Sequence, residues 1–131
     1  DIIATVTPAR APVLTAEWVK PGTHVNAIGS DAPGKQELES GLTVKARVFV
    51  DSIEQASHSG EINVPWSQGL LNKDKLAGTI GEVIAGMIPG RTSDREVTVF
   101  DSTGLSIQDM AVAHLVYERA LRENMGSDVD L

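Results

Sequence analysis

The stretch HVNAIGSDAPGKQEL, residues 24–38, joins a short apolar run to a loop that contains Gly29, Gly34 and Lys35. The run is rich in Val and Ile and ends at a glycine, which is typical of a short buried strand followed by a turn. Three other segments have the same form, and they cover residues 1–8, 46–52 and 95–102. Polar or glycine residues follow each of them, so the sequence predicts four short strands.

The segments between these runs carry helical patterns. One helix is predicted to begin near Pro33 and Gly34, and short helices are predicted near Trp18 and Ile53. The clearest pattern covers residues 104–124, where apolar side chains gather on one face and charged side chains lie near the end. The apolar residues of that face are Ile107, Ala111, Val112, Leu115 and Val116.

A further helix is predicted over residues 73–90, because large apolar residues recur there about every four positions. These residues are Leu76, Ile80, Ile84 and Met87. Gly86 and Pro89 are expected to end this helix. The glycines within the pattern, Gly78, Gly81 and Gly86, are explained by close packing, not by a phosphate-binding turn.

Strands that alternate with helices predict an α/β fold, in which a parallel sheet is flanked by helices. Residues 1–131 are expected to form a single domain, with the long last helix lying across the sheet or against a segment outside this chain. Ligands of such sheets bind in the crevice outside the carboxyl ends of the strands. Hydroxyl residues, glycines and carboxylates follow the predicted strands at positions 5–7, 29–31, 51–52 and 101–104. The same residue types suit turns and helix N-caps, so both interpretations remain open.

Composition argues against several classes of protein. The hydrophobic content of 41% is ordinary for a folded domain, and eleven basic against eighteen acidic residues give a net charge of -7. Lys and Arg are spread along the chain, which argues against a nucleic acid partner. The absence of cysteine excludes disulfides and thiolate metal sites and favours a cytoplasmic location. No apolar run approaches the roughly 20 residues that cross a bilayer, so no membrane partner is expected.

The loop at residues 29–35 has the spacing of a phosphate-binding loop, but three residues argue against that function. Such a loop needs a Ser or Thr after its lysine to hold magnesium, and Gln36 stands there instead. Pro33 removes one backbone N–H donor from the cradle. Asp31 would place a negative charge where the phosphate should bind. The sequence therefore argues against a nucleotide hydrolase.

Asp31 has two possible functions. It stands just after a predicted strand and shortly before Pro33, a position typical of a helix N-cap. A carboxylate at the mouth of a crevice can instead exchange a proton with a substrate, provided that burial raises its pKa towards neutrality. Lys35 is placed to pair with that carboxylate or with a cofactor phosphate or ribose. The spacing alone favours the N-cap.

Four segments together resemble the ornithine cyclodeaminase/mu-crystallin family, which includes archaeal-type NAD-dependent alanine dehydrogenases and ketimine reductases. They are HVNAIGSDAPGKQEL, VFVDSIEQASHSGEINVP, GEVIAGMIPGR and VTVFDSTGLSIQD. The resemblance runs in order over nearly the whole chain, and the wording of its motifs is most similar to the alanine dehydrogenase branch. It implies the second half of a Rossmann-type NAD(P)-binding domain.

The resemblance also implies the roles of particular residues. Asp31 corresponds to the acid/base residue of the family and would also contact the amino acid substrate, next to Thr103. Lys35 would contact the dinucleotide. The remaining residues expected beside NAD or NADP are Thr5, Ile28, Gly29, Ser30 and Ser102. No metal site is expected.

The family's glycine-rich pyrophosphate turn and its substrate-binding Arg and Lys have no counterpart in this sequence. We therefore expect the chain to correspond to the C-terminal part of a family enzyme. Two alternative functions remain open. In one, it is a non-catalytic module that binds a nucleotide or small ligand, or that pairs with a partner supplying the missing N-terminal half. In the other, it is a purely structural piece that folds through self-association as a homo-oligomer. The sequence leaves open whether this chain alone binds the NAD(P) of the complete enzyme.

Other residues are weaker candidates. His24, His58 and His114 lack the mutual spacing of metal ligands. Residues 57–65 could bring His58 and Glu61 into the crevice, but a surface loop is favoured there. Trp18 and Trp66 are expected to pack rather than to stack on a ligand, and Tyr117 is expected in a core or an interface.

Overall fold

The computed structural model describes residues 1–127 and 129. Five parallel strands form one sheet in the order β1-β2-β5-β3-β4. The strands are β1 (Ile2–Thr5), β2 (His24–Ala27), β3 (Arg47–Val50), β4 (Gly78–Thr79) and β5 (Thr98–Asp101). The predicted parallel α/β sheet is confirmed, and β4 is a strand that the sequence pattern did not predict.

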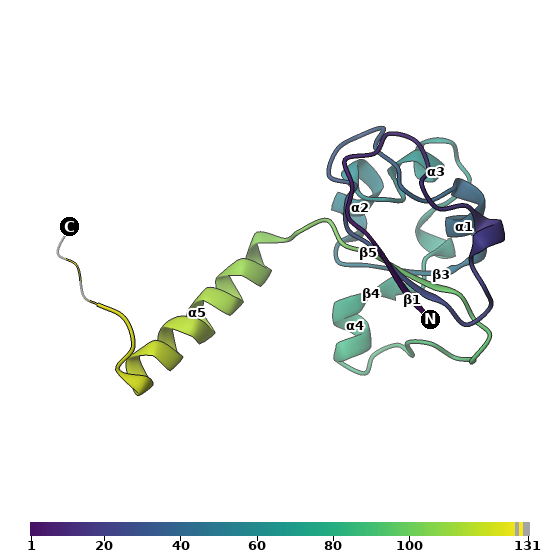
Figure 1. Cartoon of the computed structure of the whole chain (residues 1–131). Coiled ribbons are helices and arrows are strands. Elements are labelled where there is room, and N and C mark those ends of the chain that lie inside the picture. Colours follow the sequence, from purple (N-terminus) through teal and green to yellow (C-terminus); the bar gives the residue numbers. More distant parts are fainter. Residues whose placement is uncertain (128, 130–131) are drawn as a thin grey trace.

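Short helices connect the strands. They are η1 (Ala16–Trp18), α1 (Ser40–Lys45), α2 (Ile53–Ser59), α3 (Asn63–Ser67), η2 (Lys73–Lys75) and α4 (Ile80–Ile84). The chain moves from β2 to β3 and on to β4 in one direction along the sheet, and then returns to β5. Because crossovers between parallel strands are right-handed, this reversal places α4 on the opposite side of the sheet from α1, α2 and α3 (Figure 1).

The core lies between the sheet and the layer formed by α1, α2 and α3. Val25, Val48, Val50 and Val99 contribute fully buried side chains from the three central strands, and Leu42, Ala56 and Ile62 pack against them from the helical layer. Full burial of each large aliphatic side chain contributes about 1.5–3 kcal/mol. The packing fixes the three central strands, and therefore also fixes where their carboxyl ends lie.

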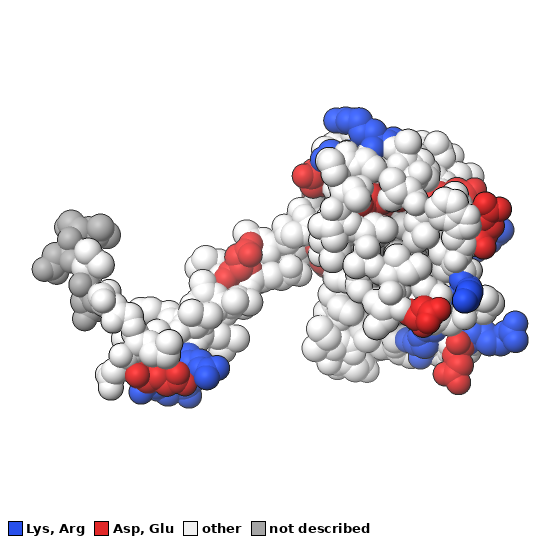
Figure 2. Space-filling view, in the orientation of Figure 1, with Lys and Arg blue, Asp and Glu red and all other residues white. Residues whose placement is uncertain are grey.

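The last helix, α5 (Ser106–Glu123), confirms the predicted long C-terminal helix but does not dock on the sheet. It extends away from the body of the molecule (Figure 1), and its large apolar side chains are more than half exposed. The expected packing across the sheet is wrong, whereas packing against a segment outside this chain stays a prediction. Gly104, in the left-handed region at φ 74°, lies in the segment that leads into α5. Most of α5 is uncharged in Figure 2, and charged side chains gather towards its C-terminal end.

Two predicted helices are corrected. No helix begins near Pro33, because the chain turns at Gly34 (φ 77°) and the next helix starts only at Ser40. Residues 73–90 form η2, β4 and the single turn of α4 instead of one long helix. Gly86 does follow α4 at φ 70°.

Close packing was predicted for several glycines and aromatic residues, and the structure confirms it for only some of them. A Cβ at Gly78 would collide with Ile88, so close packing is confirmed there, whereas Gly81 and Gly86 have space. Trp66 packs against the core as predicted. The prediction for Trp18 is wrong, since 62% of its surface is exposed. Tyr117 is likewise exposed on α5 and joins no core.

Candidate functional site

The carboxyl ends of four strands lie level with one another. Thr5 of β1 pairs with Ala27 of β2, which pairs with Asp101 of β5, and Asp101 pairs with Val50 of β3. The ladder continues one step beyond the strands, where the Ile28 N–H donates to the Thr5 carbonyl at 2.9 Å. The segments that follow these strands therefore begin at one edge of the sheet, as expected from the sequence.

Gly29 lies in close contact with the segment that follows β1. A Cβ at this position would lie within 3.0 Å of the backbone N and O of Thr7 and of the Glu37 carboxyl carbon. Glu37 is fully buried, and its carboxylate accepts hydrogen bonds from the N–H groups of Thr7 (2.6 Å) and Gly29 (2.9 Å). This carboxylate joins the segments after β1 and β2 into one structure.

Ser30 is buried, and its hydroxyl group is directed into the protein. The hydroxyl lies within hydrogen-bond distance of the carbonyls of Lys35 (3.1 Å), Ser59 (3.3 Å) and Gly60 (3.1 Å). Since a hydroxyl has a single proton, these carbonyls share one donor. The Ser30 side chain therefore holds the loop in place, and a ligand at this edge would meet only its backbone.

Asp31 and Lys35 form an ion pair at the outer end of the same loop. The Asp31 side chain is 70% exposed, whereas that of Lys35 is 17% exposed. The hydrogen bond and positive charge of Lys35 lower the pKa of Asp31 below its ordinary value. The N-cap prediction for Asp31 is wrong, because no helix follows it, and the burial that would raise its pKa is absent.

Asn63, at the start of α3, holds the backbone of this loop. Its amide oxygen accepts from the Gly34 N–H at 2.8 Å, and its amide nitrogen donates to the Lys35 carbonyl at 2.8 Å. The nitrogen also donates to the Gly60 carbonyl at 2.6 Å. Lys35 thus extends from a backbone that Asn63 holds at two points, the Gly34 N–H and the Lys35 carbonyl. Asn63 was not identified in the sequence, where an Asn inside a predicted loop carries no distinguishing signal.

Asp51 organises the segment after β5. Its carboxylate accepts from the Thr103 N–H (2.6 Å), the Thr103 hydroxyl (2.8 Å) and the Gly104 N–H (3.2 Å). The Ser102 N–H donates to the Ala27 carbonyl at 3.0 Å, which brings Ser102 beside the end of β2. The sheet edge therefore places Ser102 near Ile28 and Gly29, while the Thr103 hydroxyl proton is already donated to Asp51.

The hydroxyl of Thr5 has no hydrogen-bond partner among the described residues, although Thr5 is only 7% exposed. Leaving such a group unpaired costs about 1–3 kcal/mol. Thr5 ends β1, next to the loop that contains Gly29. An unpaired buried hydroxyl at the carboxyl edge of a parallel sheet points to a ligand that completes its hydrogen bonds.

A family model described as the ornithine cyclodeaminase/mu-crystallin family matches residues 1–124. The chain belongs to this family. The alanine dehydrogenase of Archaeoglobus fulgidus is 57% identical over 129 residues, which are 98% of the chain and 40% of that relative. The chain spans about 40% of the length of the curated relatives it matches.

Solved structures of dehydrogenases and reductases have the same fold as this chain. An archaeal alanine dehydrogenase dimer with bound NAD gives a TM-score of 0.92 at 56% identity, and the match covers 100% of this chain and 41% of that one. The Δ1-pyrroline-2-carboxylate reductase of Thermococcus litoralis, solved with NADH and L-proline, gives 0.91 at 35% identity over 98% of this chain and 40% of that one. This chain of the ornithine cyclodeaminase/mu-crystallin family therefore has the fold of the C-terminal part of NAD-binding enzymes.

The surface position predicted for Glu61 is wrong. This residue was expected in a surface loop with His58, but it is fully buried in the turn between α2 and α3, whereas His58 is exposed. Burial raises the pKa of Glu61 to about 8, and it raises that of Asp101 to about 7. The signal in the sequence was the glycine before Glu61, which leaves room for a close approach.

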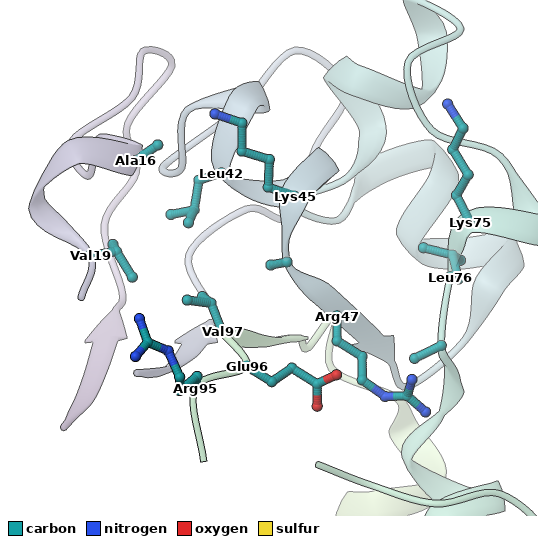
Figure 3. A pocket seen from close by; sticks show the side chains of 12 residues that line it. Ala16, Val19, Leu42, Lys45, Arg47, Lys75, Leu76, Arg95, Glu96 and Val97 are labelled. Atoms are coloured by element: carbon teal, nitrogen blue, oxygen red, sulfur yellow. The ribbon is translucent and has the colours of Figure 1, made fainter. Parts of the chain in front are cut away.

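A cavity of about 620 Å³ lies elsewhere, at the amino ends of the strands. Lys45, Arg47, Lys75 and Arg95 are among its lining residues, and the Glu96 carboxylate is turned towards Arg47 (Figure 3). None of the residues expected to act on a ligand lines it. Because ligands of open parallel sheets bind at the carboxyl ends of the strands, the edge that carries Thr5 and Asp31 is the better candidate site.

Within residues 1–127 and 129, no helix is long and apolar enough to cross a membrane. The same part of the chain contains no group of three or more His, Cys, Asp or Glu residues that could hold a metal ion. On the face shown in Figure 2, Lys and Arg side chains are interspersed with Asp and Glu.

Proposed function

We propose that this chain is the C-terminal, NAD(P)-binding portion of an enzyme that interconverts an amino acid with its imino or oxo acid. The relatives named above include an alanine dehydrogenase, and one neighbour was solved with NADH and L-proline. The observation that carries the proposal is the unpaired, buried hydroxyl of Thr5 at the sheet edge shared with Gly29 and Ser102. The activity itself belongs to a protein longer than this chain.

The residues at this edge fit a dinucleotide. Ile28 is 45% exposed and can cover an apolar ring, and the Thr5 hydroxyl can donate to or accept from the ligand. Gly29, whose N–H is donated to Glu37, would contribute its remaining backbone atoms. Ser30 would contribute its backbone, since its hydroxyl is used internally. Lys35 and Ser102 would complete the contacts. When bound, NAD(P) supplies the hydride acceptor or donor, and the protein supplies binding and orientation.

In this proposal Asp31 handles the proton. Because Lys35 lowers its pKa, Asp31 is ionised at neutral pH and can orient a water molecule, but it is a weak base while it is paired with Lys35. Contact between Lys35 and a cofactor oxygen would weaken the ion pair between Lys35 and Asp31. Loss of that ion pair would move the pKa of Asp31 back towards its ordinary value. Thr103, held by Asp51, would face the substrate.

A chimera tests the proposal. The part of the Archaeoglobus fulgidus alanine dehydrogenase that precedes the matched segment is fused to this chain, and NADH formation is measured with alanine and with ornithine. We expect activity with one of them, and a loss of about 100-fold or more in Asp31→Asn, the scale of general acid/base catalysis.

The control is Asp74→Asn, which removes another exposed carboxylate, from η2, and should leave activity unchanged. Activity that survives Asp31→Asn would exclude the proton-transfer role. A folded chimera that is inactive with both substrates, and that shows no NAD binding by calorimetry, would refute the proposed function.

A further inference from the structure

Three buried carboxylates follow one another from the sheet to the candidate site. Asp101, at the end of β5, accepts hydrogen bonds from the N–H groups of Glu61 (2.9 Å) and Ile62 (3.1 Å). Glu61 in turn accepts from the N–H groups of Glu37 (3.0 and 3.1 Å) and Leu38 (2.7 Å). Each carboxylate thus holds the backbone of the residue that bears the next one.

The third carboxylate completes the series at the site. Glu37 accepts from the N–H groups of Thr7 and Gly29, as described above. All three carboxylates use both oxygens as acceptors for backbone N–H groups. Six backbone N–H groups from irregular segments are satisfied in this way, which buried backbone requires.

Two glycines make room for the series. A Cβ at Gly29 would lie 2.6 Å from the Glu37 carboxyl carbon, and a Cβ at Gly60 would lie 2.6 and 2.7 Å from the Asp101 oxygens. Any side chain at either position would push a carboxylate away from its donors. The first and last carboxylates of the series therefore each depend on a neighbouring glycine.

The three carboxylates have no basic partner. Glu37, Glu61 and Asp101 are all fully buried, and the ion pairs found within 4.0 Å among the described residues involve none of them. Glu61 faces the carboxylates of Asp101 and Glu37, and Asp101 faces that of Asp51. Burial raises the pKa of Glu61 to about 8 and that of Asp101 to about 7, and the neighbouring carboxylates add to both increases.

We infer that Glu37, Glu61 and Asp101 act in series as positioning residues, which set the backbone of Thr7 and Gly29 at the candidate site from the end of β5. The series itself is independent of any ligand, whereas its importance for catalysis rests on the proposed function. A change at Glu61 can reach Gly29 through the backbone of Glu37, whose carboxylate accepts from the Gly29 N–H. The series therefore transmits a change in the charge of Glu61 to residues that Glu61 does not touch.

The test is a pH titration of backbone amide signals by NMR between pH 5 and 9, on this chain without any ligand. We expect the amides of Glu37 and Leu38 to shift with the titration of Glu61, and those of Thr7 and Gly29 to shift with the same midpoint. In Glu61→Gln the shifts with that midpoint should disappear from all four amides. Glu54→Gln, an exposed carboxylate on α2, is the matched control and should leave them intact.

Two results would overturn the inference. One is a wild-type titration in which Glu37 and Leu38 respond while Thr7 and Gly29 do not, and this result needs no variant to fold. The other is a folded Glu61→Gln protein in which the shifts of Thr7 and Gly29 persist. A subsequent titration with NAD separates the two proposals, because coupled amides without NAD binding leave the series intact and count against the proposed function.

Discussion

Gly29 and Thr7 lie so close together that no side chain fits between them, since a Cβ at Gly29 would come within 3.0 Å of two backbone atoms of Thr7. Gly29→Ala should therefore force the segments after β1 and β2 apart. We expect a loss of about 1–3 kcal/mol in the free energy of unfolding, the scale of overpacking in a dense interior. Urea denaturation measures it.

Gly81→Ala is the control for that substitution. Gly81 lies in α4, and a Cβ there would meet only the Thr79 hydroxyl at 3.9 Å. Alanine favours helix, so this variant should be as stable as the parent or up to about 1 kcal/mol more stable. Equal effects of the two substitutions would show that the contact between Gly29 and Thr7 is not restrictive.

Thr5→Val should affect stability and binding in opposite directions. Valine has nearly the same shape as threonine and removes a buried hydroxyl that lacks a partner, so the ligand-free protein should become more stable. If the hydroxyl contacts the cofactor, NAD binding should weaken about fivefold, equivalent to one hydrogen bond of about 1 kcal/mol. Thermal denaturation and calorimetric titration give the two quantities.

Thr43→Val provides the comparison for Thr5→Val. Thr43 is also fully buried, but its hydroxyl donates to the Ser40 carbonyl at 3.0 Å. Valine there should lower the free energy of unfolding by about 1 kcal/mol and leave NAD binding unchanged. If Thr5→Val destabilises the protein as Thr43→Val does, the Thr5 hydroxyl has a partner after all.

Stability should fall as the pH rises from 5 to 8. The folded-state pKa values of Glu61 and Asp101, about 8 and about 7, exceed their ordinary values of 4.5 and 3.8. Between those limits the folded protein binds more protons than the unfolded chain, so raising the pH favours unfolding by at most about 1.4 kcal/mol per pH unit for each group. Denaturation curves at several pH values measure the slope.

Glu61→Gln should reduce that slope, because one of the two titrating groups is removed. Asp31 has the opposite dependence, since its pKa is lowered and its contribution is lost only as the pH falls below its ordinary value of 3.8. It therefore does not disturb the measurement above pH 5. A wild-type stability that is constant or rises from pH 5 to 8 would contradict the raised pKa values.

We expect the isolated chain to self-associate through α5. Ile107 and Leu115 are 71% and 63% exposed on this helix, and exposed apolar area of this extent favours burial against a second copy. Sedimentation should show a dimer or larger species, which the double variant Ile107→Lys, Leu115→Lys converts to monomer.

Gln108→Lys adds one positive charge, half of what the double variant adds, at an exposed polar position of α5 and should not change the association. A wild-type chain that sediments as a monomer over the whole accessible concentration range would refute the prediction. Dissociation by Gln108→Lys as well would attribute association to net charge instead of to apolar contact.

The strands that were predicted have a signal in the sequence. Apolar runs mark β1, β2, β3 and β5. In β3 and β5 they reflect burial on both faces of a parallel sheet, whereas Ile2 of the edge strand β1 is exposed. β4 escaped because it consists only of Gly78 and Thr79. The helix expected near Pro33 fails for a tertiary reason, since the Gly34 N–H donates to Asn63, which is distant in the sequence.

The location of the candidate site on the sheet was predictable because the strands themselves were. Strand ends identify which segments meet at one edge, so Thr5, Gly29 and Ser102 were placed correctly relative to the sheet. The buried state of Glu37 and Glu61 was not predictable from their own positions, because a glutamate in a polar loop is exposed in most proteins. Their burial depends on backbone donors supplied by other segments.

The series of carboxylates also constrains how this sequence can change over evolutionary time. If a neutral apolar residue replaced one carboxylate, two backbone N–H groups on the next segment would lose their acceptors. A single replacement at position 37, 61 or 101 is therefore harmful by itself, whatever follows at the other two. These positions, together with the glycines at 29 and 60, are expected to be inherited as one unit, while the exposed surface around them diverges freely.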